Sequence, residues 1–320
     1  MTVLVTGGAG YIGSHVVRLL KNRGDEVVVI DDLSEGFQAR IGSTPLLSLD
    51  LSEDDVIPEI STLLEQYSVT SVVHLAARKK VGESVLRPDW YERQNVGGLK
   101  NLLAAMRESQ VQELVFSSSA AVYGMPDTAQ ADENTPCKPI NPYDQTKLDG
   151  EFLIREAATT WGLREVSLRY FNVAGTGWSD LADVQAANLI PIVFNALRDN
   201  TNPQVFGNDW PTLDGTCVRD YVHVADLAEA HLFALDYLKN PDRPHDVFNV
   251  GTGKGSSVLE VIHTVAEVTG HNLIPDIQPR RVGDPASLSA NVNRIESVLG
   301  WKAKHNLRDI VSSVWEAKSN

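Results

Sequence analysis

The sequence has little of three things that would direct a chain to particular partners or compartments. Only two cysteines occur in 320 residues, so a disulfide framework is excluded and a reducing compartment is expected. Basic residues number 28 against 42 acidic ones, and the net charge of −14 argues against nucleic acid or an anionic membrane as the main partner. No apolar run has the length of a membrane span. An apolar strand begins directly after Met1 and leaves no room for a signal peptide, so we expect a cytoplasmic protein.

Hydrophobic residues, in contrast, are plentiful: they make up 42% of the chain, enough for one large or two intimate domains. Strand-like segments alternate with segments whose apolar residues share one helix face. Such alternation predicts an α/β fold with a doubly wound parallel sheet of the Rossmann type, whose ligands lie outside the carboxyl ends of the strands. The strand candidates are residues 2–6, 26–30, 70–75, 114–118 and 165–170.

The pattern loosens after Asn172, where Gly, Asn and Pro interrupt the regular alternation. A strand followed by a helix returns at residues 222–238, and one more strand is expected at 246–250. We therefore predict an NAD-binding domain over residues 1–171, with a return near 218–250. A smaller mixed region over residues 172–320 is predicted to bind the substrate.

A glycine cluster follows the first strand and precedes an amphipathic helix. Gly8, Gly10 and Gly13 fit G-x-G-x-x-G, and Gly7, Gly10 and Gly13 fit the spacing G-x-x-G-x-x-G. Glycine permits positive φ and lets a pyrophosphate approach bare backbone, while the helix N-terminus offers free N–H groups to the anion. Asp31 ends the second strand, where a carboxylate would bind a ribose diol and repel the 2′-phosphate of NADP. The motif therefore predicts NAD.

A tyrosine and a lysine, Tyr143 and Lys147, stand four residues apart in a segment that suits a helix start, so they share one helix face. A neighbouring ammonium group is expected to lower the pKa of the phenol, which makes Tyr143 a candidate general base. Ser119 closes a serine cluster at the carboxyl end of a strand and could bond the same substrate oxygen. For Ser117 and Ser118, turn chemistry is an equally good interpretation.

Together these motifs and four further stretches resemble the UDP-glucose 4-epimerases of the extended short-chain dehydrogenase/reductase superfamily, over essentially the whole chain. The resemblance implies interconversion of UDP-glucose and UDP-galactose by transient oxidation at sugar C4 with tightly bound NAD. It also implies a homodimer formed through helices near residues 96–107 and 147–160. The four stretches are residues 74–84, 169–175, 215–224 and 280–284.

The resemblance assigns roles to individual residues of this chain, and no metal is expected. Leu288 would face the sugar's C2 substituent and discriminate only partly against N-acetylated sugars. The implied catalytic residues are Ser119, Tyr143 and Lys147. The implied NAD-binding residues are Gly7, Gly10, Tyr11, Ile12, Gly13, Asp31, Asp50, Leu51, Lys79, Asn95, Tyr143, Lys147 and Tyr170. The implied UDP-sugar-binding residues are Ser119, Tyr143, Asn172, Asn188, Leu189, Arg219, Arg281, Asp284 and Leu288.

Other functions stay open at this point. Ser119 is followed by two alanines, and the absence of a carboxylate there disfavours a 4,6-dehydratase. Another NAD-dependent nucleotide-sugar epimerase or a decarboxylase of the same superfamily remains an alternative. A non-catalytic dinucleotide sensor is the alternative from a different class. Two departures from the family pattern are a basic patch at residues 78–80 and Gln94, which stands where an asparagine is usual.

Overall fold

The computed structural model describes residues 1–185, 188–242, 245–281 and 283–319 and divides the chain into two compact units. The predicted NAD-binding domain over residues 1–171, with a return near 218–250, and the predicted substrate-binding region over residues 172–320 stay predictions. The first unit comprises Met1–Val122, Pro139–Arg169 and Ala228–Phe248. The second unit comprises Tyr123–Lys138, Tyr170–Leu227 and Asn249–Asn320.

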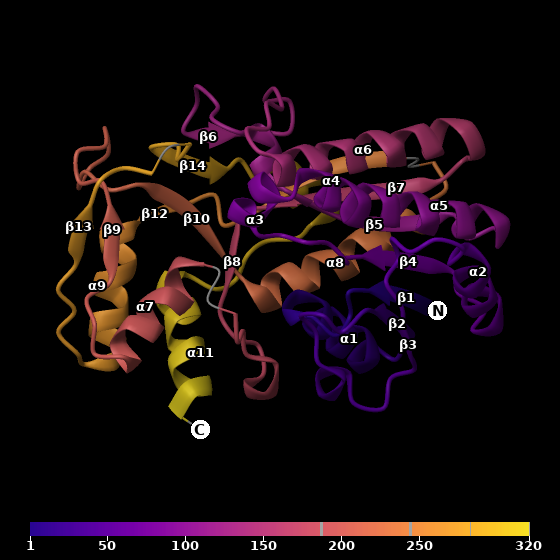
Figure 1. Cartoon of the computed structure of the whole chain (residues 1–320), viewed down its shortest axis with the longest axis horizontal. Helices are drawn as coiled ribbons and strands as arrows, with labels where there is room; N and C mark the ends of the chain where they lie inside the picture. The colour runs from indigo at the N-terminus through magenta and orange to yellow at the C-terminus, as the bar shows by residue number, and fades with distance from the viewer. Residues whose placement is uncertain (186–187, 243–244, 282, 320) are drawn as a thin grey trace. The chain divides into compact units, whose positions relative to one another are not determined.

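A seven-stranded sheet forms the centre of the first unit, in the order β11-β7-β5-β4-β1-β2-β3. Its strands from β7 to β3 are labelled in Figure 1. Neighbouring strands from β3 through β5 pair in parallel. The inner residues of β1, β4 and β5 are buried inside this sheet, as expected for strands covered on both faces. The predicted α/β fold with a parallel sheet is confirmed. The strands are β1 Thr2–Thr6, β2 Glu26–Asp31, β3 Leu46–Ser48, β4 Ser71–His74, β5 Glu113–Ser119, β7 Arg164–Tyr170 and β11 His245–Val250.

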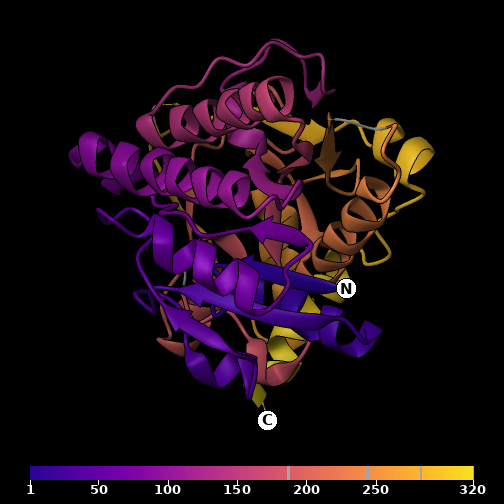
Figure 2. The same cartoon turned by 90° about the vertical axis from the view of Figure 1, so that its right-hand side faces the viewer.

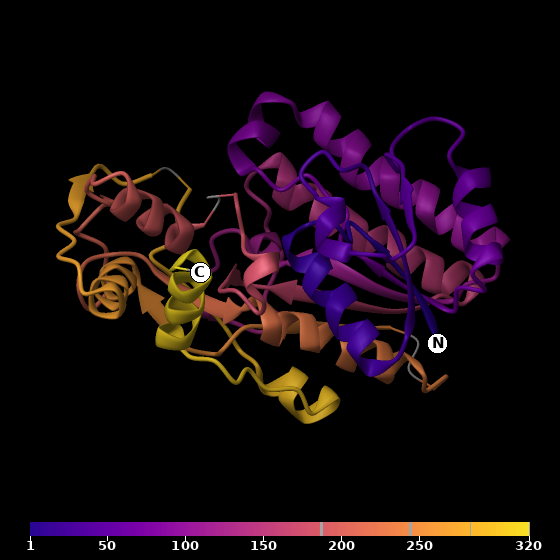
Figure 3. The ribbon, with the colours of Figure 1, turned by 90° about the horizontal axis from the view of Figure 1, so that it is seen from below.

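Helices cover both faces of this sheet. On one face α2, α5 and α6 share a core with the strands, in which Leu4, Ile60, Leu102 and Ile154 are fully buried. Figure 2 shows α5 and α6 side by side, and Figure 3 shows α1 and the end of α8 on the opposite face. The helices are α1 Tyr11–Arg23, α2 Ile57–Gln66, α3 Val81–Leu86, α4 Pro88–Tyr91, α5 Gly98–Glu108, α6 Pro142–Trp161 and α8 Val224–Leu238.

A π-helix, η2 Glu92–Gly97, precedes α5 and runs directly into it. A π-turn widens the helix by one residue and rotates the side chains that follow it, and such turns are frequent at functional sites. Here it places Asn95 in a buried position beside α6, where the Asn95 amide donates to Thr146 Oγ1 at 3.0 Å.

The glycine turn between β1 and α1 leaves no room for side chains. Gly7 has φ +70°, and a Cβ at that position would lie 2.7 Å from the Ala76 amide nitrogen. A Cβ on Gly13 would lie 2.1 Å from the Gly7 carbonyl oxygen. Backbone crossing over backbone therefore requires glycine at both positions.

The second unit is built on a smaller mixed sheet in the order β12-β10-β14-β6, with β8 pairing β10. Strand β12 is antiparallel to β10 and β14 is parallel to it. Helices α7, α9 and α11 pack together in a separate apolar core. The elements are β6 Gln130–Ala131, β8 Asn172–Ala174, β9 Gln204–Phe206, β10 Val218–His223, β12 Gly255–Ser257, β13 Asp276–Gln278, β14 Ser287–Ala290, α7 Leu189–Arg198, α9 Val258–Thr269, α10 Asn293–Leu299 and α11 Leu307–Ser319.

Candidate active site

The N-terminus of α1 is open to an anionic ligand. Gly10 is its N-cap and supplies no side-chain cap, and the first turn carries no acidic residue. The unsatisfied N–H groups and the helix dipole therefore favour a phosphate there. Tyr11 and Ile12 form the first turn of this helix.

Asp31 ends β2 beside the glycine turn. Its carboxylate accepts from the backbone N–H of Ala9 and of Leu33, both at 2.9 Å. Burial raises the pKa of Asp31 above its usual range, and the two backbone donors oppose that rise. A carboxylate offers about four acceptor sites, so two bonds leave capacity for a ribose hydroxyl. The arrangement fits the predicted role.

Of the other cofactor candidates, Asp50, Leu51 and Lys79 lie on the loops after β3 and β4, Asn95 lies in η2, and Tyr170 ends β7. Burial opposes the ionisation of Asp50, but hydrogen bonds from Gln94 and Ser52 outweigh it and lower the pKa of Asp50. Leu51 is buried, whereas Lys79 is exposed. These positions are compatible with the predicted roles, which stay predictions.

The three catalytic candidates come from β5 and α6. Ser119 ends β5, and its hydroxyl is hydrogen-bonded to Tyr143 in the first turn of α6. Lys147 lies one turn further along α6, is buried, and donates from Nζ to the Ser117 carbonyl oxygen at 2.8 Å. The structure thus assembles a hydroxyl, a phenol and an amine at the carboxyl end of a central strand.

The expected lowering of the tyrosine pKa is wrong for the chain by itself. Burial raises the pKa of Tyr143 to about 12, and the Ser119 hydrogen bond opposes this only in part. Burial also lowers the pKa of Lys147 to about 8, so desolvation favours the neutral form of both groups. Spacing in a sequence showed that the two side chains share a helix face, but it could not show how dry their surroundings are.

The sequence analysis gave no role to His74, a buried histidine near Lys147. His74 at the end of β4 bonds Thr6 Oγ1 through Nδ1 at 2.7 Å and stacks on Phe116. Burial, with the Lys147 charge, lowers the pKa of His74 to about 3, so this imidazole stays neutral. No motif in the sequence could have revealed it, because the pairing joins residues 68 positions apart.

A buried ion pair joins β7 to α6, and a serine of β5 bonds to the same carboxylate. Arg169 on β7 donates from two guanidinium nitrogens to the two carboxylate oxygens of Glu151, at 2.8 and 2.6 Å. Ser118 donates to the same carboxylate at 2.5 Å. Ser118 therefore supports the position of α6, and Ser117 supplies the carbonyl that receives Lys147.

Apart from Ser119 and Tyr143, which belong to the first unit, the candidate UDP-sugar residues lie in the second unit, on or beside its sheet. Asn172 on β8 pairs with Tyr221 on β10, and Arg219 on β10 pairs with Leu288 on β14. Asn188, which precedes Leu189 at the start of α7, donates to the Val173 carbonyl at 2.8 Å. The mixed sheet thus gathers side chains from segments more than 100 residues apart.

Two arginines give this unit cationic groups. Arg219 donates to the carbonyls of Val218 and Pro285 and pairs with the carboxylate of Asp284 at 3.2 Å. The Arg281 guanidinium lies over the Phe206 ring, 3.7 Å from its centroid. Val282, in the same predicted stretch, lies outside the described residues.

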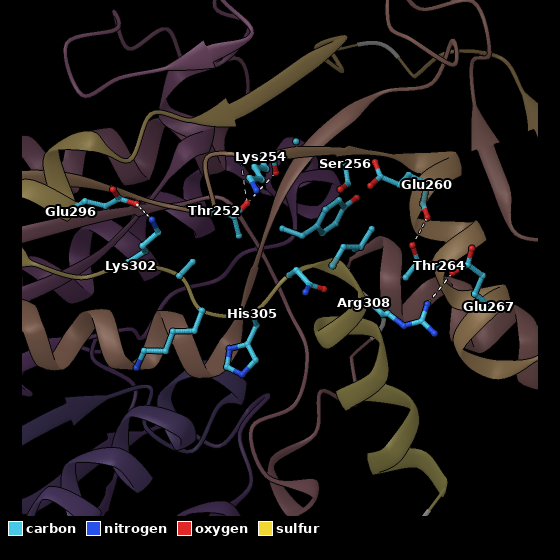
Figure 4. A pocket seen from close by; sticks show the side chains of 16 residues that line it. Thr252, Lys254, Ser256, Glu260, Thr264, Glu267, Glu296, Lys302, His305 and Arg308 are labelled. Atoms are coloured by element: carbon cyan, nitrogen blue, oxygen red, sulfur yellow. Dashed lines mark hydrogen bonds and ion pairs between the residues drawn. The ribbon is translucent and has the colours of Figure 1, made fainter.

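A groove of about 720 Å³ in the second unit contains none of the predicted site residues (Figure 4). Charged side chains on its walls pair with one another: Lys302 with Glu296 at 3.8 Å, and Arg308 with Glu267 at 2.9 Å. Because these charges are already paired, the groove offers no convergent set of groups for a ligand, and we assign it no function.

No group of three or more His, Cys, Asp or Glu side chains in the described ranges could hold a metal ion. Within those same ranges, no helix combines the length and the apolar character needed to cross a bilayer.

Comparison with known proteins identifies the family. The NAD-dependent epimerase/dehydratase family matches residues 3–251. The UDP-glucose 4-epimerase of Halalkalibacterium halodurans is 42% identical over 320 residues, covering 98% of this chain and 95% of that protein.

Solved structures agree. The UDP-glucose-4-epimerase from Stenotrophomonas maltophila, with bound NAD and formylated UDP-arabinopyranose, is 40% identical with a TM-score of 0.94 and covers 100% of this chain and 98% of its own. The UDP-Glc/GlcNAc 4-epimerase from Campylobacter jejuni is 35% identical with a TM-score of 0.87, covering 99% of both chains. The chain belongs to the NAD-dependent epimerase/dehydratase family, in its UDP-glucose 4-epimerase branch.

Proposed function

We propose that this chain interconverts UDP-glucose and UDP-galactose, with NAD held throughout the reaction. The observation that carries the proposal is the set formed by Ser119, Tyr143 and Lys147 at the end of β5 and the start of α6. A sensor that had lost its chemistry would have no need of these three groups together. The likeness to UDP-glucose 4-epimerases over nearly the whole chain supports the same conclusion.

Inversion at sugar C4 needs oxidation because no acidic proton is available at that carbon. NAD, when bound, would supply the acceptor for the C4 hydride and the donor for its return to the other face of the sugar. Tyr143 takes the O4 proton in the oxidation and gives it back in the reduction. Ser119 holds the same oxygen and orients the phenol.

The high pKa of Tyr143 gives the positive charge of oxidised NAD a role in the proposed mechanism. With a pKa of about 12, Tyr143 is protonated at neutral pH in the chain alone. A cation placed beside the phenol lowers that pKa, and an oxidised nicotinamide ring carries such a charge. Lys147 adds to the effect when it is protonated, so base strength and cofactor binding are linked.

We propose that UDP is held by the second unit through Asn172, Asn188, Leu189, Arg219, Arg281 and Asp284. Guanidinium groups bind diphosphate by charge-assisted hydrogen bonds, and an acidic protein must supply them locally. Binding energy placed on UDP, remote from the reacting carbon, leaves the keto sugar free to turn over.

A second candidate substrate class is the N-acetylated UDP-sugars, since one structural relative is named as a UDP-Glc/GlcNAc 4-epimerase. Leu288 is buried on β14, while Ser287 and Ser289 point to the other side of that strand. If Leu288 gates the C2 substituent, its apolar surface gives an acetamide no hydrogen-bond partner and makes such substrates slow. A comparison of turnover for acetylated and plain UDP-sugars decides between the classes.

We also propose a cytoplasmic homodimer. The scarcity of cysteine supports a reducing compartment. Of the two helices that the resemblance implies, near residues 96–107 and 147–160, the second is α6, which exposes Phe152; Val85 and Leu86 are exposed on α3, which contacts α6. Exposed apolar groups gathered on neighbouring elements are typical of an association surface.

The direct test is turnover of UDP-galactose by the parent and by Tyr143→Phe. We expect the substitution to lower kcat by about 10²–10⁴-fold, the usual contribution of general base catalysis, while bound NAD and UDP are retained. Absorbance of reduced nicotinamide after addition of UDP-sugar reports the hydride step in the parent. A variant that keeps more than half of the parent rate would show that Tyr143 is not the base.

A further inference from the structure

Arg78 links three segments of the first unit through its side chain. Its guanidinium pairs with the Asp32 carboxylate and donates to the Ser34 hydroxyl, both on the loop after β2. Its Nε donates to Gln94 Oε1 in η2 at 2.7 Å. Only about 17% of the Arg78 side chain is exposed, so these bonds are partly shielded from water. One guanidinium therefore fastens the loop after β4 to the loop after β2 and to η2.

The backbone of Arg78 is fixed as firmly as its side chain. Asn95 accepts from the Arg78 amide at 2.7 Å and donates to the Arg78 carbonyl at 3.0 Å. Because both backbone groups are held, the side chain projects from a defined base. The planar guanidinium is therefore preorganised for its hydrogen bonds to Asp32, Ser34 and Gln94.

The network continues to a fourth segment, the loop after β3. Gln94 donates from Nε2 to Asp50 Oδ2 at 2.8 Å and also bonds the Ser52 hydroxyl. The loops after β2, β3 and β4 all leave the carboxyl edge of the parallel sheet, where the glycine turn after β1 also lies. The Arg78 network therefore surrounds the edge at which Asp31 is placed to bind ribose.

We propose that Arg78 is a positioning residue that fastens these loops around the adenosine half of bound NAD and sets how slowly NAD leaves. The inference rests on the proposed function, in which loss of NADH in mid-cycle would strand the keto sugar. Departure of NAD requires the loops to part, and parting breaks a charge-assisted bond and two further hydrogen bonds together. We expect the change in NAD affinity to lie in the dissociation rate, because most mutations in a binding site act on that rate.

Two variants separate the geometry of the Arg78 network from the charge of Arg78. Arg78→Leu removes the guanidinium and keeps apolar bulk. Arg78→Lys keeps the charge, but an ammonium group on a flexible stem cannot reproduce the planar fork that meets Asp32, Ser34 and Gln94 at once. Arg87→Leu is the matched control: both arginines lie over the Trp90 ring, Arg87 at 3.9 Å and Arg78 at 5.2 Å from its centroid, but Arg87 pairs with Glu83 and not with Asp32, Ser34 or Gln94.

The measurement is the release of labelled NAD from preloaded holoenzyme after a chase with unlabelled NAD. We expect Arg78→Leu to speed release about tenfold, Arg78→Lys to restore less than half of the loss on a logarithmic scale, and Arg87→Leu to stay within twofold of the parent. Asp32→Asn should speed release by itself, and its effect should not add to that of Arg78→Leu, because both break one contact. A merely structural role would lower the thermal unfolding midpoint of these variants and leave the release rate of NAD unchanged.

Release from Arg78→Leu within twofold of the parent overturns the proposal, as does full rescue by Arg78→Lys, which would reduce Arg78 to a source of positive potential. If Arg78→Leu fails to fold, Gln94→Ala removes one partner of the guanidinium, and unchanged release from that variant is also contrary. Failure of the proposed function gives a different result, namely no turnover of UDP-galactose by the parent even though NAD release is measurable.

Discussion

At the scale of single residues, burial decides the proton state of the candidate active site. Tyr143 and Lys147 have pKa values of about 12 and about 8, both shifted toward the neutral form by desolvation. His74 stays neutral for the same reason. A charge added beside these buried groups therefore changes their pKa values strongly, because little water is present to screen it.

Asp144 gives a stability prediction with a defined sign. It follows Tyr143, is almost fully buried, and one of its carboxylate oxygens has no hydrogen-bond partner. Burial raises its pKa from 3.8 to about 6. Between these two pH values the folded state binds more protons than the unfolded state, so stability falls as pH rises through that window.

Asp144→Asn should therefore stabilise the fold by about 1–3 kcal/mol at pH 7–8, with a gain that vanishes toward pH 4. The measurement is the thermal unfolding midpoint of parent and variant across pH 4–8. Asp149→Asn on the same helix is the control, because Asp149 accepts from Gln145 near the surface. A gain that stays constant with pH would show that the Asp144 charge is not its source.

At the scale of elements, α6 positions both Tyr143 and Lys147, so the proposed catalysis depends on its first turn. Asn141 is the N-cap: its Oδ1 accepts from the Asp144 amide at 3.0 Å, and its Nδ2 donates to the Asp144 carboxylate at 2.7 Å. A cap of this kind satisfies one of the free N–H groups at a helix start. Tyr143 lies in the turn that this cap holds in place.

Asn141→Ala should lower the free energy of unfolding by about 1 kcal/mol and also reduce kcat roughly tenfold, because a loosened first turn misplaces the phenol. Asn306→Ala is the matched control: Asn306 Oδ1 caps α11 by accepting from the Asp309 amide at 3.1 Å. That control should cost similar stability with kcat unchanged. Equal losses of kcat in both variants would show that general destabilisation explains the effect.

At the scale of the whole molecule, the two units divide the candidate residues by role. The first holds the glycine turn, Asp31 and the catalytic set, and the second gathers Asn172 and Arg219 on its own sheet. Exposed apolar side chains on α3 and α6 support the proposed association of two chains.

The homodimer predicts that charges placed on this surface separate the chains. Leu86→Glu combined with Phe152→Glu should shift the mass in sedimentation equilibrium from dimer to monomer, because each buried carboxylate would lack a partner. Leu213→Glu, at a fully exposed leucine of the second unit, should leave the mass unchanged. A double variant that stays dimeric would exclude this surface.

Much of the architecture follows from local rules. The alternation of strand and helix patterns identified the parallel sheet, and β1, β2, β5 and β7 lie where the apolar runs predicted them. The short strands of the second unit, such as β6 and β14, were not predicted. Two to four residues carry no readable period, and their pairing partners lie far away in the chain.

The sequence by itself determined the features that depend on nearby residues. Gly7 and Gly13 were readable because steric rules for backbone need no distant partner, and Tyr143 and Lys147 because four residues make one helical turn. Only the tertiary structure decided what depends on burial and on contacts between distant segments. The high pKa of Tyr143 and the joining of Arg78 to Asp32, 46 residues away, are of that kind. Desolvation and long-range hydrogen bonds arise when the chain packs, and spacing along a sequence does not record them.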